Sequence, residues 1–334
     1  MKTIDVNNSA VEIRGLLNGY VRIPSSVAEK LNETAKAHYD NASGGRVRFA
    51  TDSPIIEFKI KLAKPPVFSH FPLSTNSGVD VYIDGEYHSL YTPEEGSTTV
   101  VGKIYKYRTV NEIQINLPIL NHVEDIEISV DDEAQVFKAA PYKYEKPVVF
   151  YGSSITCGVA ASRPGNTYPA RLSRAVGFDF INIGFPGGCR GEIEVAEYIA
   201  GLDMSLFVLD YDHNAPKPDE LKERHDRFFK TIRAAHPDLP VLMISKPDLV
   251  NDPVKNTACR DVIYSNYSRA QAEGDENVWF IDGAWLYWND IPRDRTADWI
   301  HPTDFGFKGF CDILSAPISM ILEKTYYRKA DGND

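Results

Sequence analysis

Two adjacent serines follow the end of an apolar run in the segment FYGSSITCG (150–158). Gly152 allows the chain to turn sharply there, so a hydroxyl just beyond it is a candidate nucleophile. A Gly-Ser pair at such a turn is also ordinary helix-capping chemistry, and taken alone it favours capping. Ser153 and Ser154 therefore predict catalysis only if the chain also supplies a base and an oxyanion site.

Asp298 and His301 can supply the base. They stand three residues apart in DRTADWIHPTDFGF (294–307), just before a predicted helix. On one side of a turn, the carboxylate can accept from the imidazole Nδ1–H while Nε2 faces outward. Capping of the helix by Thr303 or Asp304 is an alternative that is compatible with this role. A metal half-site would need further ligands at supporting spacing, and none is found, so no metal is expected.

Two other strand ends carry groups that can stabilise an oxyanion. The glycines of NIGFPGGCRG (182–191) offer unobstructed backbone N–H groups, and Asn214 in LDYDHNA (209–215) offers a side-chain amide. Taken separately, the glycines are more simply explained by turn geometry. His213 beside Asn214 could serve as a base, but a single histidine in a polar loop is expected to be solvated.

The elements that must position these residues form a repeating pattern from about Lys146. Buried strands are predicted at 147–152, 179–184, 205–211, 240–245 and 277–282. Helical spacing lies between them, as at Leu221, Phe228, Ile232 and Ala235 in 219–236. Repeated β-α units predict a parallel sheet with helices on both faces and a functional site at the carboxyl ends of its strands.

The first part of the chain has a different pattern. Segments 54–62, 78–85, 106–118 and 124–132 alternate apolar and polar residues, which predicts an antiparallel β-sandwich or jelly roll. One helix is expected near Ser25–His38. The linker region 133–146 contains one proline and no flexible run, so we expect domains 1–143 and 144–334 that pack against each other.

Taken in order, these motifs resemble the SGNH (GDSL-type) hydrolase superfamily over about residues 147–322. The resemblance implies a flavodoxin-like, three-layer α/β/α domain. It also implies a catalytic triad and an oxyanion hole, with the nucleophile Ser154, the base His301, its partner Asp298, and oxyanion donors from Ser154, Gly187 and Asn214. Ser153 stands where the family has an aspartate, and 212–215 matches the Gly-x-Asn-Asp block only at the asparagine.

The segment GVDVY (78–82) resembles the Gly-x-Asp-Leu-Tyr signature of β-sandwich domains that precede certain bacterial SGNH esterases. SITCG followed by ASRPG (161–165) is similar to the same group, and related carbohydrate esterases share the architecture. The resemblance implies a serine esterase, without cofactor, that hydrolyses acyl esters, with the acetyl esters of a carbohydrate as first choice. An acyltransferase, a lipase or thioesterase, and a catalytically weak carbohydrate-binding protein remain alternatives.

Substrate contacts are less well defined by the sequence. Arg163 is expected either to bind a polar or anionic part of the substrate or to fix its loop. The aromatic residues that could stack on sugar rings or pack in the core are Tyr82, Tyr87, Tyr91, Trp285, Trp288 and Trp299. The N-terminal domain could bind carbohydrate, form a wall of the cleft, or mediate homo-oligomerisation.

Composition restricts the class of partner. The 334 residues carry a formal net charge of −11, which argues against nucleic-acid and anionic-membrane partners. The four cysteines are widely and unequally spaced, so neither a disulfide framework nor a zinc site is expected. We found no signal-peptide core and no run approaching the ~20 apolar residues that span a bilayer. The expectation is a cytoplasmic enzyme that acts on a small or oligosaccharide ester.

Overall fold

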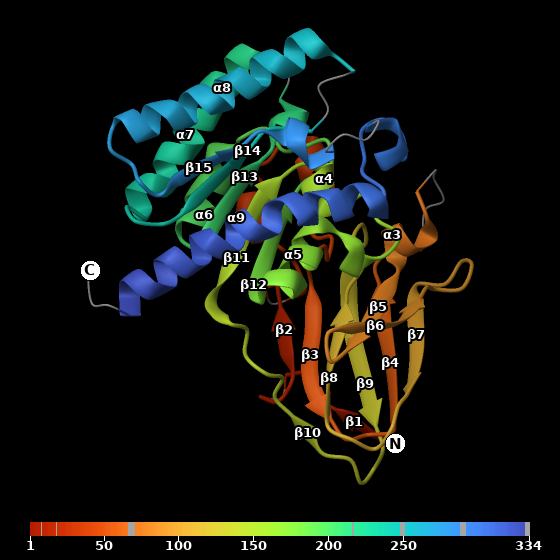
Figure 1. The fold of residues 1–334 in the computed structure, drawn as a ribbon. Coiled ribbons are helices and arrows are strands. Elements are labelled where there is room, and N and C mark those ends of the chain that lie inside the picture. Colours follow the sequence, from red (N-terminus) through yellow and green to blue (C-terminus); the bar gives the residue numbers. More distant parts are fainter. Residues whose placement is uncertain are drawn as a thin grey trace.

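The computed structural model describes residues 1–7, 9–17, 19–65, 71–215, 217–247, 251–287 and 292–330, and its strands form three sheets (Figure 1). The first sheet is antiparallel and has the order β1 (Lys2–Ile4), β9 (Val123–Val130), β4 (Ile55–Leu62), β7 (Thr99–Tyr105). The second has the order β10 (Val136–Phe137), β3 (Arg46–Thr51), β8 (Asn111–Asn116), β5 (Val79–Ile83), β6 (Glu86–Tyr91), and β2 (Glu12–Arg14) also pairs with β3.

These two sheets bury a shared apolar core, which confirms the predicted β-sandwich. In β4, for example, Ile56, Phe58, Ile60 and Leu62 point inward, while the residues between them are partly or fully exposed. The alternation that predicted this strand therefore reflects one buried and one solvated face.

Strand β3 was not predicted, although Arg46, Val47, Arg48 and Phe49 alternate polar and apolar residues. Its outward side carries Arg46, which contacts Asp179 and Phe180 of the C-terminal half, and Arg48, which contacts Glu112, the Ala140 carbonyl and the Tyr142 ring. Arg46 forms an ion pair with Asp179 at the start of β12 (Phe178–Gly184), and both side chains are at least 92% buried. The alternation of a strand is therefore present in the sequence, but the ion-pair partners that bury both arginines lie elsewhere in the chain.

The single helix expected at Ser25–His38 is wrong. The structure has two short helices there, α1 (Ser25–Ala28) and α2 (Glu33–Lys36). Asn32 has an extended conformation between them, and its side chain accepts a hydrogen bond from the Ala35 N–H at 3.1 Å. Asn32 therefore caps a new helix instead of continuing the first one.

The third sheet is parallel and confirms the predicted flavodoxin-like architecture. Its order is β12 (Phe178–Gly184), β11 (Tyr144–Gly152), β13 (Leu206–Asp210), β14 (Val241–Ile244), β15 (Val278–Ile281). In sequence order this is 2-1-3-4-5, the strand order of flavodoxin-like folds. The five segments predicted as buried strands correspond to these five strands.

Helices cover both faces of this sheet (Figure 1). One face carries α6 (Ile193–Ala200), α7 (Pro218–Ala235) and α8 (Pro253–Ala272), and α1 and α2 also pack there. The other face carries α4 (Ser154–Cys157), α5 (Tyr168–Val176) and α9 (Asp304–Ala330). The remaining elements are α3 (Leu73–Ser77) and four 3₁₀ turns, η1 (Pro164–Asn166), η2 (Asp212–Asn214), η3 (Gly283–Tyr287) and η4 (Pro292–Arg295).

Helix α9 contains a segment, Asp304–Thr325, that is long and apolar enough to cross a membrane by length and composition. The sequence prediction did not identify it. Its apolar residues Phe307, Phe310, Leu314 and Ile318 are buried against the parallel sheet, so it packs as a core helix in this structure.

Candidate active site

Ser154, His301 and Asp298 form a continuous hydrogen-bonded chain. The His301 Nε2 lies 2.9 Å from Ser154 Oγ, and His301 Nδ1 lies 2.7 Å from Asp298 Oδ2. The structure thus brings together the three residues predicted as a triad, although the serine lies 147 residues before the histidine. Because Asp298 accepts at Nδ1, the neutral imidazole keeps the lone pair of Nε2 directed at the serine hydroxyl.

The turn around Asp298 holds its carboxylate in the charged form. Burial alone would raise the pKa of Asp298, but hydrogen bonds from the backbone and side chain of His301 and from the Ile300 N–H lower the pKa to about 2. The backbone bonds are 2.8 Å from His301 N and 3.2 Å from Ile300 N to Oδ1. Asp298 is therefore ionised throughout the neutral range.

The nucleophile turn needs a glycine before the serines. A Cβ at Gly152 would collide with Thr156 Oγ1 and with the carbonyl oxygen of Asp210. Ser153 is the N-cap of α4, and its hydroxyl accepts from the Ile155 N–H at 3.2 Å. The serine at the family's aspartate position thus has a capping role, and Ser154 is the first residue of the helix.

The oxyanion candidates all have free donors within the described residues. The N–H groups of Ser154 and Gly187 donate no hydrogen bond there, and neither does the Asn214 side chain. Gly187 (φ 66°) follows Pro186 in a turn closed by a bond from Gly188 N–H to the Phe185 carbonyl, which matches a type II turn. The Asn214 Oδ1 accepts from the Cys189 N–H at 3.4 Å, which leaves the amide N–H groups available.

The N-terminal half contacts two of these catalytic loops. Asn32 donates to the Gly188 carbonyl at 2.8 Å, and Gly188 approaches the backbone of Ala35 so closely that a Cβ would collide with it. Phe71 packs its ring against His301. No local pattern predicts these contacts, because each joins residues more than 150 positions apart.

His213 is not the solvated residue that was expected. Its Nε2 is buried and has no hydrogen-bond partner in the described structure. Burial, followed by the nearby charges of Lys246 and His301, holds the pKa of His213 well below its usual range. His213 is thus a neutral side chain beside the triad, and it is not placed to act as its base, because Ser154 is bonded to His301.

Two buried carboxyl groups lie beneath the site. Burial and the neighbouring Asp212 raise the pKa of Asp210 to about 8, although hydrogen bonds from Tyr168 and Thr156 oppose the shift. Burial likewise raises the pKa of Asp212 to about 6. The Asp210 carboxyl group accepts from Thr156 Oγ1 at 3.0 Å and Tyr168 OH at 2.8 Å, so it ties the nucleophile helix to the end of β13.

The structure distinguishes between the two roles considered for Arg163. Its guanidinium donates to Asp80 at 3.0 Å and to Tyr82 OH, and it lies 3.8 Å from the centre of the Tyr87 ring. These contacts correspond to the role of fixing the loop. They leave the guanidinium engaged by the N-terminal half rather than by a substrate.

The aromatic candidates separate into two groups. Tyr82 is buried, the Tyr91 hydroxyl donates to the Lys103 carbonyl, and the Tyr87 ring, which is 47% exposed, contacts the Arg163 guanidinium, so all three have structural contacts. Trp299 lies between Asp298 and His301, has a left-handed backbone (φ 72°) and is 47% exposed. Trp285 is also exposed. Trp288 lies outside the described residues.

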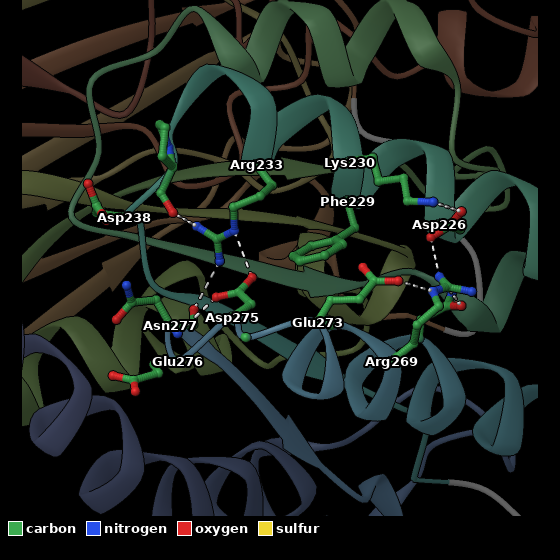
Figure 2. Close-up of a pocket in the computed structure, with 14 residues that line it drawn as sticks. Asp226, Phe229, Lys230, Arg233, Asp238, Arg269, Glu273, Asp275, Glu276 and Asn277 are labelled. Atoms are coloured by element: carbon green, nitrogen blue, oxygen red, sulfur yellow. Dashed lines mark hydrogen bonds and ion pairs between the residues drawn. The ribbon is translucent and has the colours of Figure 1, made fainter.

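A polar hollow of about 530 Å³ lies between α7 and α8, away from the triad (Figure 2). Its lining includes residues just before β14 and β15, so it opens at the amino end of the sheet, opposite the catalytic edge. Its charged groups bind one another, as in the Arg233–Asp275 pair at 2.8 Å. In the described parts of the chain, no cluster of three or more His, Cys, Asp or Glu side chains could hold a metal.

A hydrogen-bonded Ser-His-Asp chain at the carboxyl edge of a parallel sheet is an arrangement typical of ester hydrolases. The model of the GDSL-like lipase/acylhydrolase family matches residues 145–319, and that of the N-terminus of SGNH-hydrolase-type esterases matches residues 2–136. The chain therefore belongs to the GDSL-like lipase/acylhydrolase family, as the sequence motifs predicted, and is a carboxylic ester hydrolase.

Solved structures with the same two-part architecture include a candidate GDSL-like lipase from Bacteroides ovatus. It is 28% identical, covers 96% of this chain and 98% of its own, and has a TM-score of 0.84. The salicylyl-acyltransferase SsfX3 from a tetracycline biosynthetic pathway is 20% identical over 96% of each chain, with a TM-score of 0.80.

A family two carbohydrate esterase from Clostridium thermocellum, solved in complex with cellohexaose, shares the fold at lower identity. It is 14% identical, covers 84% of this chain and 93% of its own, and has a TM-score of 0.65. No curated protein matches the sequence of this chain.

Proposed function

We propose that this enzyme removes acyl groups, and in particular acetyl groups, from a carbohydrate ester through an acyl-enzyme on Ser154. The observation that carries the proposal is the hydrogen-bonded chain from Ser154 Oγ through His301 to the ionised Asp298. This arrangement activates a hydroxyl for attack on an ester carbonyl without a metal.

In the acylation step, His301 Nε2 takes the proton of Ser154 as Oγ forms a bond to the ester carbonyl carbon. Asp298 stabilises the resulting imidazolium. The tetrahedral intermediate then breaks its bond to the alcohol oxygen, which leaves with the proton from His301. The product is an acylated Ser154 and a free sugar hydroxyl.

In the deacylation step, a water molecule replaces the alcohol. His301 removes one proton from this water as its oxygen attacks the acyl carbon, and the proton then returns to Ser154 Oγ when the acid leaves. The three free donors, Ser154 N–H, Gly187 N–H and the Asn214 amide, are proposed to bind the oxyanion of both intermediates.

The proposal of a sugar substrate is supported by the exposed aromatic side chains beside the triad. Trp299 carries an indole within two residues of His301, and its left-handed backbone is a strained conformation that is concentrated at functional sites. An exposed indole offers a flat apolar face with a polar edge, which suits a pyranose ring. The cellohexaose complex of the clostridial carbohydrate esterase is consistent with this substrate class.

The experiment is an acetate-release screen across acetylated mono- and oligosaccharides with the wild type, Ser154→Ala and Trp299→Ala. We expect release by the wild type, none by Ser154→Ala, and a raised KM for sugars with Trp299→Ala but unchanged hydrolysis of nitrophenyl acetate. Adding an acceptor alcohol distinguishes hydrolysis from acyl transfer. Faster turnover of long-chain nitrophenyl esters than of any sugar acetate would overturn the substrate assignment.

A further inference from the structure

Asp80, in β5 of the N-terminal half, is a fully buried carboxylate with no part in the triad. It accepts hydrogen bonds from Asn116 Nδ2 at 2.8 Å, from Arg163 at 3.0 Å and from the Gly165 N–H at 2.9 Å. Two of its three donors belong to the loop 158–167, which follows the nucleophile helix α4. Asp80 therefore links the β-sandwich to a loop that begins four residues after Ser154.

The same loop is held from the opposite side by Asp304. The Asp304 carboxylate accepts from the Ser162 N–H and from Asn166 Nδ2, both at 2.8 Å, and from the Ser162 hydroxyl. Asp304 is the first residue of α9 and lies three residues after His301. The loop is thus bound between a carboxylate of the N-terminal half and a carboxylate of the segment that carries the catalytic histidine.

The loop 158–167 is packed so closely against its neighbours that it cannot shift without displacing them. A Cβ at Gly165 would lie 2.5 Å from Tyr82 Oη and 2.8 Å from Asp80 Oδ2. Arg174, from α5, donates to the Gly165 carbonyl at 2.6 Å, and Thr75 donates to the Ala161 carbonyl at 2.5 Å. A displacement of Asp80 or Arg163 would therefore be transmitted to Ser162 and Asn166.

We infer that Asp80 is a positioning residue for catalysis: through the loop 158–167 and Asp304, it sets the place of His301 relative to Ser154. The inference rests on the proposed triad. Loss of the Asp80 charge leaves the partly buried Arg163 without its ion pair and frees the loop, so that His301 Nε2 moves from its 2.9 Å contact with Ser154 Oγ. Misplacement of reacting groups by ~1 Å costs about 10²-fold in rate.

The chain offers a matched control. Asp179 and Arg46 form a second buried ion pair between the two halves, but Asp179 lies at the amino end of β12, opposite the catalytic edge. Asp179→Asn and Asp80→Asn each remove one buried interdomain charge. Both should destabilise the protein, whereas only Asp80→Asn should disturb the triad.

The test compares the wild type, Asp80→Asn and Asp179→Asn by the rate of fluorophosphonate labelling, by kcat and KM on nitrophenyl acetate, and by Tm. We expect Asp80→Asn to slow labelling and lower kcat by ~10–100-fold with little change in KM. Asp179→Asn should lower Tm yet stay within about twofold of the wild-type rates. If the two variants lose labelling equally, or Asp80→Asn labels like the wild type, the inference is wrong.

A second variant covers the case in which Asp80→Asn does not fold. Arg163→Gln keeps Asp80 bonded to Asn116 and Gly165 and removes the ion pair and the guanidinium contacts with Tyr82 and Tyr87, so we expect a smaller loss of kcat in the same direction. An unchanged kcat in a folded Arg163→Gln would contradict the inference. Failure of the wild type to react with the fluorophosphonate would instead overturn the proposed serine mechanism.

Discussion

The ring of Phe71 lies edge-on against the imidazole of His301, with the ring centroids 5.3 Å apart and the planes at 83°. Phe71 belongs to the N-terminal half, in the segment before α3, and His301 belongs to the turn before α9. Of the three roles considered for the N-terminal half, a wall of the cleft is the one that this contact supports. The contact also restricts the imidazole to an orientation in which both ring nitrogens have partners.

Phe71→Ala should lower kcat by ~2–10-fold, since an aromatic pair contributes about 0.5–1.5 kcal/mol and the freed imidazole samples unproductive orientations. Steady-state kinetics on nitrophenyl acetate measures this. Phe137→Ala, which removes a partly exposed ring from β10, is the control and should leave kcat unchanged. Equal effects of the two substitutions would rule out a specific role for the Phe71 contact.

Ser153→Ala should retain labelling by a fluorophosphonate but reduce stability by about 1 kcal/mol, because it removes the N-cap of α4. Ser153→Asp should retain most of the stability that Ser153→Ala loses, since a carboxylate can accept from the same N–H and is favoured at a helix N-terminus. Urea unfolding and labelling of each variant measure the two effects. Loss of labelling in Ser153→Ala, with Ser154→Ala still labelled, would show that Ser153 is the nucleophile and Ser154 is not.

Asn214→Ala should lower kcat by about 10²–10³-fold while KM changes little, because the amide is proposed to bind the charge that develops only in the transition state. Its side chain makes one long bond in the free enzyme, from Cys189 N–H at 3.4 Å, so stability should be nearly unaffected. Kinetics and thermal unfolding of the same preparation check both statements. A rise in KM at constant kcat would argue for a role in substrate binding only.

Asp298→Asn should lower kcat by up to about 10⁴-fold, because an amide can donate to Nδ1 and leave the wrong imidazole tautomer facing Ser154. The pKa of Asp298, about 2, lies below its ordinary 3.8. Its contribution to stability is therefore present above about pH 4 and lost as the pH falls towards 2. The stability difference between wild type and variant, measured by urea unfolding, should shrink over that interval. A difference that does not vary with pH would contradict the low pKa.

Asp210→Asn should make stability less dependent on pH. The pKa of Asp210, about 8, lies above its ordinary 3.8, so the folded state retains a proton that the unfolded state releases. Wild-type stability should thus fall as the pH rises from about 4 to 8, and part of this fall should disappear in the variant. Asp212, whose pKa of about 6 is also raised, contributes to the same fall in stability with rising pH. Urea unfolding at pH 5 and pH 8 tests this, with the exposed Asp238→Asn as control.

The sequence predicted those parts of the molecule that local patterns determine. Apolar runs identified all five parallel strands, because strands that helices cover on both faces consist mostly of apolar residues. The triad was predicted because Asp298 and His301 share one turn, Ser154 follows a strand end, and the motifs in order resemble those of SGNH hydrolases. In contrast, β3 was missed although its residues alternate, and the capping role of Asn32 was overlooked, so one helix was expected where two are found.

The contacts that complete the site were not predictable in this way. Phe71 lies 230 positions before His301, and Asp80 lies 83 positions before Arg163, so no periodicity connects them. The sequence could assign Arg163 equally to a substrate or to its loop, because a guanidinium suits either. The choice depends on the Asp80 carboxylate of the N-terminal half, which lies 3.0 Å from the Arg163 guanidinium only after the chain has folded.

The close approach of α2 to Gly188 also limits how such enzymes can be recombined. Because the backbone of Ala35 occupies the space of a side chain at Gly188, the two segments must change together. A chimera that joined the hydrolase half to a foreign β-sandwich would lose the support of the turn that holds Gly187. An exchange of substrate specificity between such enzymes should therefore transfer the two halves together. A substitution on one side of the contact between α2 and Gly188 should be accompanied by a compensating substitution on the other side.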